Sequence, residues 1–387
     1  MSSQVPPLTR IVTLGRRGVM RNAAAATATA LLPNTVAGNQ PVYAGAIRWD
    51  AWDAVRSNVS IAVAASLAPL QFHGRAPFCA TEHGDSVDFE ACNTQDVMEA
   101  EIAAASAAGI SYWAYCWYGP SDSMMAAWSL HQSSPNRNSV NWCLLLQFSR
   151  LSGFASRIPA YLAYFRQPNY QRVLGSRPLV YLYVDQLTHL ASDWGGNWAN
   201  LRAILENLAV ACVGVGVNRP YLVILSGNPS TARDIMTALA GDAISNYIGR
   251  IASGRPAPYT ALDTTTQSYW AEMAATGAPV IPICMTGWDA RPRKLHPPPW
   301  DHNQKPGVGM DTYVTPGAPA QIAAHINSAI AYIDTHPATC PARTLLIYSW
   351  DECDEGGSPL IPTYTASGPN HAILDAVGTV LRTRKGN

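Results

Sequence analysis

The sequence predicts an α/β protein, a single (β/α)8 TIM barrel with elaborated loops. Eight short apolar runs recur along the chain, and longer stretches with helical periodicity separate them. Near-continuous apolar runs are typical of strands that are covered on both faces, and their alternation with helices indicates parallel βα units. The length of 387 residues fits one such barrel with long loops.

The predicted strands are rich in aliphatic, β-branched and aromatic residues. In chain order they are residues 43–50, 111–119, 141–149, 179–185, 221–227, 243–248, 280–288 and 344–352. The connecting stretches include Ala-rich segments that are predicted to be helical. These are residues 95–108, 197–213, 230–240, 264–276 and 318–335. No internal repeat or low-complexity linker follows residue 37, so residues 38–387 are predicted to form one domain.

The composition argues against several classes of partner. Apolar residues make up 48% of the chain and charged residues only 13%, about half of the usual share of roughly 25%. The formal net charge is zero, so we expect no binding to nucleic acid or to an anionic membrane surface. After the N-terminal segment, no stretch approaches the roughly 18 uninterrupted apolar residues of a membrane span. We therefore predict no membrane span. Separately, we expect the protein to be a monomer.

The N-terminus is predicted to be a targeting segment. Residues 15–21 (Gly-Arg-Arg-Gly-Val-Met-Arg) resemble a twin-arginine export signal, and the uncharged run 23–32 follows them. Small residues at 35–37 offer a cleavage site. Residues 1–37 are therefore predicted to direct export to the periplasm or beyond. The alternative is an N-terminal extension on a cytoplasmic protein.

The eight cysteines are compatible with export. Cys79 and Cys92 flank a polar loop and are candidates for a disulfide, whereas Cys116 and Cys143 lie in apolar strands and are predicted to be buried thiols. No C-x-x-C pair or His/Cys cluster has the spacing of a metal site. We expect no metal and no cofactor.

Aromatic and polar residues gather where the predicted strands end. A barrel of this kind places its site at the carboxyl ends of its strands, and aromatic rings beside carboxylates are typical of a sugar-binding cleft. The alternative for any one aromatic residue is core filling. The candidate substrate-binding residues at these ends are Trp49, Asp50, Trp117, Tyr118, Tyr247, Trp288, Asp289, Trp350 and Asp351.

Glu352 and Glu355 are the candidate catalytic residues. They lie three residues apart, just beyond the apolar run 345–350, and two glycines follow them. Two carboxyl groups near one glycosidic bond can divide the acid and base roles, because like charges push their pKa values apart. The alternative is a solvated acidic loop. The apolar run that precedes the pair favours a barrel rim instead.

Several segments resemble the glycoside hydrolase family 99-like proteins, which include the WbsX-like group and endo-α-mannosidases. Residues 349–356 (Ser-Trp-Asp-Glu-Cys-Asp-Glu-Gly) resemble the W-N-E-W-x-E-G signature of that family. Residues 287–293 resemble its G-W-D-x-x-P-R segment, and residues 109–118 its aromatic second strand. Gly-Ser-Arg-Pro at 175–178 also matches in position.

The resemblance covers roughly residues 41–365 and implies a retaining glycosidase. It implies that Glu352 deprotonates a sugar 2-hydroxyl to close a 1,2-anhydro intermediate, and that Glu355 acts as acid and then as base. Asp351 and Cys353 depart from the Asn and the second Trp of the signature. These departures leave the reaction class better supported than the choice of mannose.

Asp289 and Arg293 have two interpretations. As site residues, the Asp accepts hydrogen bonds from sugar hydroxyls and the Arg binds a carboxylate on an acidic sugar. As structural residues, they form an ion pair with each other that orders their loop.

The leading prediction is an exported glycoside hydrolase that acts on a polysaccharide or oligosaccharide. The first alternative is a glycosyltransferase-type enzyme of surface-polysaccharide assembly, although no Gly-rich phosphate loop or D-x-D metal site is evident. The second is a non-catalytic carbohydrate-binding barrel.

Overall fold

The computed structural model describes residues 40–52, 57–249, 251, 256–301 and 304–383 of the chain. Residues 38–387 form one compact unit. The predicted export signal at residues 1–37 lies outside the described residues.

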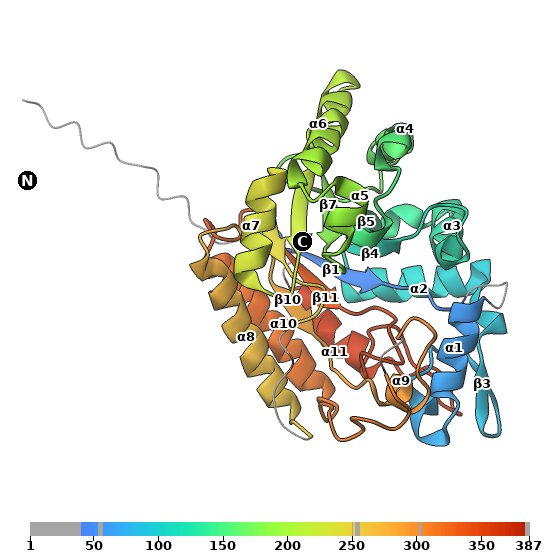
Figure 1. Cartoon of the computed structure of the whole chain (residues 1–387). Helices are drawn as coiled ribbons and strands as arrows, with labels where there is room; N and C mark the ends of the chain where they lie inside the picture. Colours follow the sequence, from blue (N-terminus) through green and yellow to red (C-terminus); the bar gives the residue numbers. More distant parts are fainter. Residues whose placement is uncertain (1–39, 53–56, 250, 252–255, 302–303, 384–387) are drawn as a thin grey trace, which may run out of the picture. The chain divides into compact units, whose positions relative to one another are not determined.

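Eight parallel strands form the barrel, in the order β10-β11-β1-β4-β5-β7-β8-β9 (Figure 1). Their bounds are β1 Tyr43–Arg48, β4 Tyr112–Trp117, β5 Asn141–Gln147, β7 Arg177–Tyr183, β8 Tyr221–Leu225, β9 Ala243–Ser245, β10 Ile283–Met285 and β11 Thr344–Tyr348. Each overlaps one of the eight predicted runs. The Ile244 N–H donates to the Pro279 carbonyl (2.9 Å) and the Ile281 N–H to the Ile244 carbonyl (3.0 Å). These bonds join β9 to the segment before β10, so the predicted (β/α)8 barrel is confirmed.

The helices lie around the outside of the strands, and α8 and α10 run side by side (Figure 1). The helices that match predicted ones are α2 Gln95–Ala108, α6 Trp198–Gly214, α7 Pro229–Leu239, α8 Tyr259–Ala275 and α10 Pro319–Thr335. The others are α1 Asn58–Leu67, α3 Ala126–Ser133, α4 Ile158–Phe165, α5 His189–Trp194, α9 Arg291–Leu295 and α11 Ala372–Leu381. Short 3-10 helices are η1 Leu70–Arg75, η2 Glu90–Cys92, η3 Ser123–Met125, η4 Arg137–Ser139, η5 Phe148–Arg150 and η6 Phe154–Arg157.

Local sequence signals explain where α2 begins and ends. The Thr94 side chain accepts the Val97 N–H and so satisfies one unpaired donor of the first turn. Gly109 follows the last turn with a φ of 84°, a left-handed conformation that glycine adopts without strain. The chain then enters β4 at Tyr112, so this turn delivers it directly to the barrel.

Side chains along each strand alternate between the barrel interior and the layer beneath the helices. The Tyr112 hydroxyl lies 2.7 Å from the Tyr181 hydroxyl and 2.9 Å from that of Thr344, which both belong to other strands. Tyr112 therefore points into the barrel. An ideal Cβ at Gly45 would lie 2.1 Å from the Tyr112 ring, so only glycine fits beside it.

Trp117 lies five residues beyond Tyr112 on the same strand and so points outward. Its ring packs against Trp128 of α3 at 5.2 Å and against Trp142 of β5 at 5.9 Å, measured between ring centres. These rings form part of the core between the barrel and the helices, where offset and edge-to-face aromatic contacts add to hydrophobic burial.

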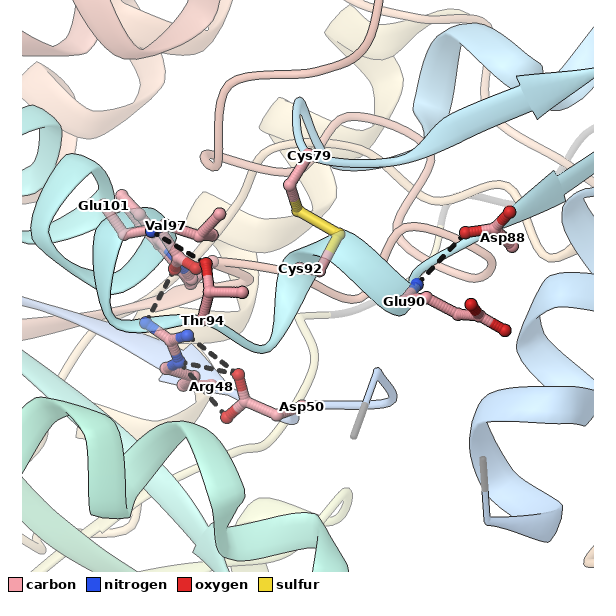
Figure 2. Close-up of a disulfide and its surroundings, with 10 residues drawn as sticks. Arg48, Asp50, Cys79, Asp88, Glu90, Cys92, Thr94, Val97 and Glu101 are labelled. Carbon is pink, nitrogen blue, oxygen red and sulfur yellow. Dashed lines mark hydrogen bonds and ion pairs between the residues drawn. A yellow bond between two sulfur atoms is a disulfide. The ribbon is translucent and has the colours of Figure 1, made fainter. Parts of the chain in front are cut away.

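The loop after η1 contains a short antiparallel hairpin, β2 Thr81–His83 and β3 Ser86–Asp88. A disulfide between Cys79 and Cys92 closes the segment that holds it, and α2 follows directly (Figure 2). The candidate disulfide is therefore present. A second short antiparallel pair forms where β6 Arg172–Val173 lies against the start of β7.

Cys116 and Cys143 are buried free thiols, as predicted. Across the described ranges, no helix is long and apolar enough to cross a membrane. Within those same residues, no group of three or more His, Cys, Asp or Glu side chains is arranged to hold a metal ion.

Candidate active site

The loop that follows β11 is held in one tight turn. The Glu352 N–H donates to the Ser349 hydroxyl (3.1 Å), and the Gly356 N–H donates back to the Glu352 carbonyl (2.8 Å). The Asp289 N–H donates to the Glu355 carbonyl (2.9 Å), which ties this turn to the segment after β10. Glu352 and Glu355 therefore project from one turn at the carboxyl end of the barrel, where (β/α)8 enzymes place their active sites.

Glu352 is buried, with 3% of its surface exposed. Two tyrosine hydroxyls donate to its carboxyl group. Tyr247, just beyond β9, reaches Oε1, and Tyr348, the last residue of β11, lies 3.0 Å from Oε2. The Trp288 ring lies 6.0 Å from that of Tyr348. Residues at the ends of β9 and β11 thus meet at this carboxyl group, and Trp288 beyond β10 packs beside one of them.

Arg293 connects the loop after β11 to the aromatic rim. Its guanidinium forms an ion pair with Glu355 and donates to both Asp354 oxygens, at 2.8 and 3.0 Å. One of its nitrogens lies 4.0 Å from Glu352 Oε2. The guanidinium carbon also lies 5.2 Å from the centre of the Trp49 ring, within cation–π range.

Both carboxyl groups have raised pKa values, and their surroundings differ. Burial and then the negative charge of Glu355 raise the pKa of Glu352 to about 8, although Arg293 and the two tyrosine hydroxyls oppose the rise. Burial also raises the pKa of Glu355, but Arg293 and a hydrogen bond from Glu352 favour its ionised form. Glu352 therefore keeps a proton near neutral pH, while Arg293 favours the ionised form of Glu355.

Other predicted rim aromatics lie on one side of this pair. The Trp49 indole N–H donates to the Tyr118 hydroxyl (2.7 Å), and the Gln147 amide also donates to that hydroxyl (3.3 Å). The Trp300 ring meets Trp49 edge-on at 5.8 Å. Trp300 follows the Pro-rich stretch after α9 and is 39% exposed, so it offers a ring face at the barrel mouth.

A cavity of about 430 Å³ lies on the other side, at the ends of β7, β8 and β9. Tyr183 lines it and stacks at 4.7 Å on Tyr247, whose hydroxyl donates to Glu352. Asp185 also lines the cavity, and the Ser149 N–H (2.9 Å) and hydroxyl hold its carboxylate. The cavity therefore offers aromatic faces and an oriented hydrogen-bond acceptor next to the carboxyl pair.

No family model matches the chain, and no curated protein matches it. Among solved structures, it is similar to the GH99 endo-alpha-mannosidase from Bacteroides thetaiotaomicron in complex with bis-tris-propane. The identity is 14%, the match covers 88% of this chain and 95% of the other, and the TM-score is 0.51. A second structure of the GH99 endo-alpha-mannosidase from this organism matches with the same identity and coverage and a TM-score of 0.47. The chain shares the GH99 barrel fold. The resemblance expected from the sequence is thus confirmed for the fold.

Within this GH99-like barrel, several predicted substrate-binding residues have almost no exposed surface. They are Asp50, Trp117, Asp289, Trp350 and Asp351, each at most 4% exposed. Burial alone does not exclude them, since Glu352 is buried too, but their contacts do. Trp117 packs outside the barrel, and the Trp350 indole N–H donates to Glu101 of α2 (2.8 Å).

Asp50 and Asp351 also contact other groups of the protein. Asp50 accepts two contacts below 3.0 Å from Arg48, and Asp351 accepts the Trp49 N–H at 2.8 Å. These contacts turn the two carboxylates toward other groups of the protein, so neither is free to bind a sugar in this structure. Both carboxylates already have hydrogen-bond or ion-pair partners within the protein.

The alternative that Asp289 and Arg293 pair with each other is wrong. Asp289 binds Arg75 of η1 and Arg291 of α9, whereas Arg293 binds the loop after β11. Asp289 lies two residues before α9, and Arg291, the first residue of that helix, donates to its carboxylate (2.6 Å). Arg293 instead points toward Asp354 and Glu355.

Sequence reasoning missed Tyr183 and Tyr348 as site residues. Both end a barrel strand and share the inward direction, but in the sequence they look like core residues of apolar runs. The strand-end rule finds them once the strand bounds are known. Asp354, which holds Arg293 in place, carried no signal beyond its position between the two Glu residues.

Proposed function

We propose that this protein is a glycoside hydrolase that cleaves glycosidic bonds in a polysaccharide or oligosaccharide, with Glu352 and Glu355 as its catalytic pair. The observation that carries the proposal is the pair itself. Two carboxyl groups from one turn stand at the barrel mouth, and unlike surroundings divide one proton between them. Such a division is what acid–base catalysis at a glycosidic bond needs.

The resemblance assigns the base role to Glu352 and the acid role to Glu355. In the substrate-free site, however, the proton resides on Glu352, whose pKa is about 8. The assignment therefore requires the proton to move to Glu355 when substrate enters. The coupling between the two carboxyl groups supports that transfer, because Glu352 is among the groups that shift the pKa of Glu355. Glu352 is then a carboxylate that can take the proton of the sugar 2-hydroxyl, and Glu355 protonates the leaving oxygen. We propose retention of configuration on this basis.

Surfaces on both sides of the pair support a sugar chain as substrate. The Trp49–Trp300 contact and the cavity beside Tyr183 both offer ring faces and polar groups. Flat apolar faces beside hydrogen-bonding groups match the two faces of a pyranose ring.

Glu352→Gln and Glu355→Gln test the proposal. Each variant and the parent would be assayed on a panel of polysaccharides, with reducing ends and anomeric configuration followed. We expect each substitution to lower kcat by about 100-fold or more, since general acid–base catalysis contributes roughly 10²- to 10⁴-fold. Glu206→Gln on the outer face of α6, where Glu206 pairs with Arg219, is the matched control and keeps parental activity.

The two roles are separable with an activated substrate. A glycoside with an aryl leaving group needs no protonation, so the variant that lacks the acid keeps activity on it, and the variant that lacks the base does not. The proposal fails if both Glu variants turn over the panel at the parental rate. Binding of glycans without turnover by the parent would favour the carbohydrate-binding alternative.

We also propose that the protein is exported. The twin-arginine-like motif supports this, and so does the Cys79–Cys92 disulfide, because disulfides persist in oxidising compartments.

A further inference from the structure

Four buried side chains form a charged cluster behind the loop that carries Glu352. Arg48 ends β1, Asp50 follows it, Glu101 comes from α2 and Asp351 precedes Glu352. Each is at most 4% exposed. Figure 2 shows Arg48 between Asp50 and Glu101.

Charge counting makes this cluster unusual. Arg48 donates to Asp50 through Nε (2.9 Å) and lies 2.8 Å from Asp50 and from Glu101 through its two terminal nitrogens. If ionised, these two acids already carry more negative charge than one guanidinium neutralises, and burial raises the pKa of Glu101 as well. A third ionised carboxylate at Asp351 would leave a net charge of about minus two in the protein interior, which is strongly unfavourable without further partners.

The other titratable groups around the cluster supply no second cation. Tyr115 faces Arg48, and burial raises its pKa, so it stays neutral. Burial and the charge of Arg48 lower the pKa of His131 to about 3, so it is neutral as well. Cys353 lies beside Asp351, and burial raises the pKa of its thiol.

Asp351 is the least satisfied of the three acids. Its Oδ1 accepts the Trp49 N–H at 2.8 Å, but its Oδ2 is buried and has no hydrogen-bond partner among the described residues. The nearest Arg48 nitrogen is Nε, which lies 3.8 Å from Oδ2 and already donates to Asp50. Glu101, by contrast, also accepts the Trp350 indole N–H at 2.8 Å.

We propose that Asp351 is a positioning residue that works as a neutral carboxylic acid. In this form it anchors the Trp49 backbone to the loop after β11 and adds no negative charge one residue before Glu352. The proposal rests on the proposed function only for the role given to Glu352. Its test requires no substrate, so its failure is distinguishable from failure of the glycosidase assignment.

The protonation of Asp351 determines how the stability of the folded protein should change with pH. The folded protein keeps a proton on Asp351, whereas the unfolded chain releases it above the ordinary aspartate pKa of about 3.9. Rising pH then favours unfolding of the parent through this group. An Asn at this position has no such proton, so Asp351→Asn gains stability relative to the parent as pH rises.

The experiment is denaturant unfolding of the full chain, parent against Asp351→Asn, at several pH values between about 5 and about 7. We expect the ratio of parental to variant unfolding constants to rise about tenfold per pH unit. An ionised Asp351 that stabilises the fold through Arg48 predicts the reverse: a variant less stable than the parent, with a ratio that does not rise. That result would overturn the proposal.

Asp242→Asn is the matched control. Asp242 also accepts a backbone N–H, from Leu222 (2.9 Å), and lies beside an arginine, but Arg177 donates to it directly at 2.7 Å. This variant is expected to lose stability and to show no gain that grows with pH.

Infrared spectroscopy tests the proposal on the parent alone, so it remains usable if Asp351→Asn does not fold. In the parent labelled with ¹³C at aspartate carboxyl groups, a protonated aspartate band is expected at neutral pH. Its absence in the folded parent would overturn the proposal. Where the variant folds, loss of this band assigns it to Asp351.

Discussion

The Tyr247 hydroxyl donates a hydrogen bond to Glu352, although the two residues lie 105 positions apart in the chain. Tyr247 follows β9, and Glu352 follows β11, so the closed barrel is what brings them together. The same hydroxyl lies 3.2 Å from the Cys116 sulfur at the end of β4. One phenol therefore connects three strand ends beneath the proposed catalytic pair.

Tyr247→Phe removes this hydroxyl while keeping the ring. A hydrogen bond to a charged group contributes about 1.5–3 kcal/mol, so we expect kcat to fall roughly 10- to 100-fold. The pKa of Glu352 should rise further, because the hydroxyl favours its ionised form. Tyr332→Phe on α10, whose hydroxyl reaches the Trp270 carbonyl (3.4 Å), should leave kcat unchanged. Equal rates for both variants would contradict the contact's proposed role.

The pH dependence of kcat/KM should show an alkaline limb. Burial and Glu355 raise the pKa of Glu352 to about 8, and the proposed mechanism needs the proton that the pair holds below that pH. We therefore expect kcat/KM to fall about tenfold per unit above about pH 8. Tyr247→Phe should shift this limb upward. A flat profile from about pH 7 to about pH 10 would rule out this proton as the essential one.

Trp300 and Trp117 should respond differently to truncation. Trp300→Ala removes an exposed ring at the barrel mouth and should raise KM by about tenfold, since stacking contacts contribute on the order of 1 kcal/mol, with little change in Tm. Trp117→Ala opens the aromatic core outside β4 and should lower stability by about 3–5 kcal/mol. Thermal unfolding and steady-state kinetics on both variants check the contrast. A smaller rise in KM for Trp300→Ala than for Trp117→Ala would contradict our placement of the two rings.

Removing the Cys79–Cys92 disulfide should destabilise the segment around β2 and β3. We expect the double Ser variant to lose roughly 2–4 kcal/mol, as is usual when a native disulfide of similar loop length is removed. Reductant should lower the parental Tm and leave that of the double variant unaffected. A parental Tm that does not respond to reductant would contradict the prediction.

Replacing Arg16 and Arg17 with Lys should block export. Twin-arginine signals depend on the arginine pair, so the full-length precursor should accumulate in the cytoplasm. Cell fractionation with intact-mass measurement checks this, and Arg10→Lys, upstream of the motif, is the control. Cleavage at an unrelated position, or none in the parent, would exclude residues 1–37 as the signal.

The barrel was predictable because its signal is distributed. Eight buried strands each need a run of apolar residues, and an error in one run leaves the pattern of the others intact. Helix bounds such as those of α2 follow from single capping residues, Thr94 and Gly109. The short helices α5 and α9 carry too few residues for any periodicity to be visible in the sequence.

Side-chain direction was less predictable than strand position. Trp117 ends its strand, but a shift of one residue reverses the face, so the sequence alone does not separate it from Tyr118. Charged partners were also hidden. Arg48 and Glu101 lie 53 positions apart, and nothing local indicates that they share a buried cluster with Asp351.

Gly45 and Tyr112 face each other inside the barrel so closely that neither side chain can change alone. A mutation that adds any side chain at position 45 requires a smaller residue at 112, while a smaller residue at 112 leaves a void and strips Tyr181 and Thr344 of a shared hydroxyl partner. In evolutionary terms the two sites form an epistatic pair. Relatives that diverge here should therefore differ at both positions together, and intermediates with a single change should be rare.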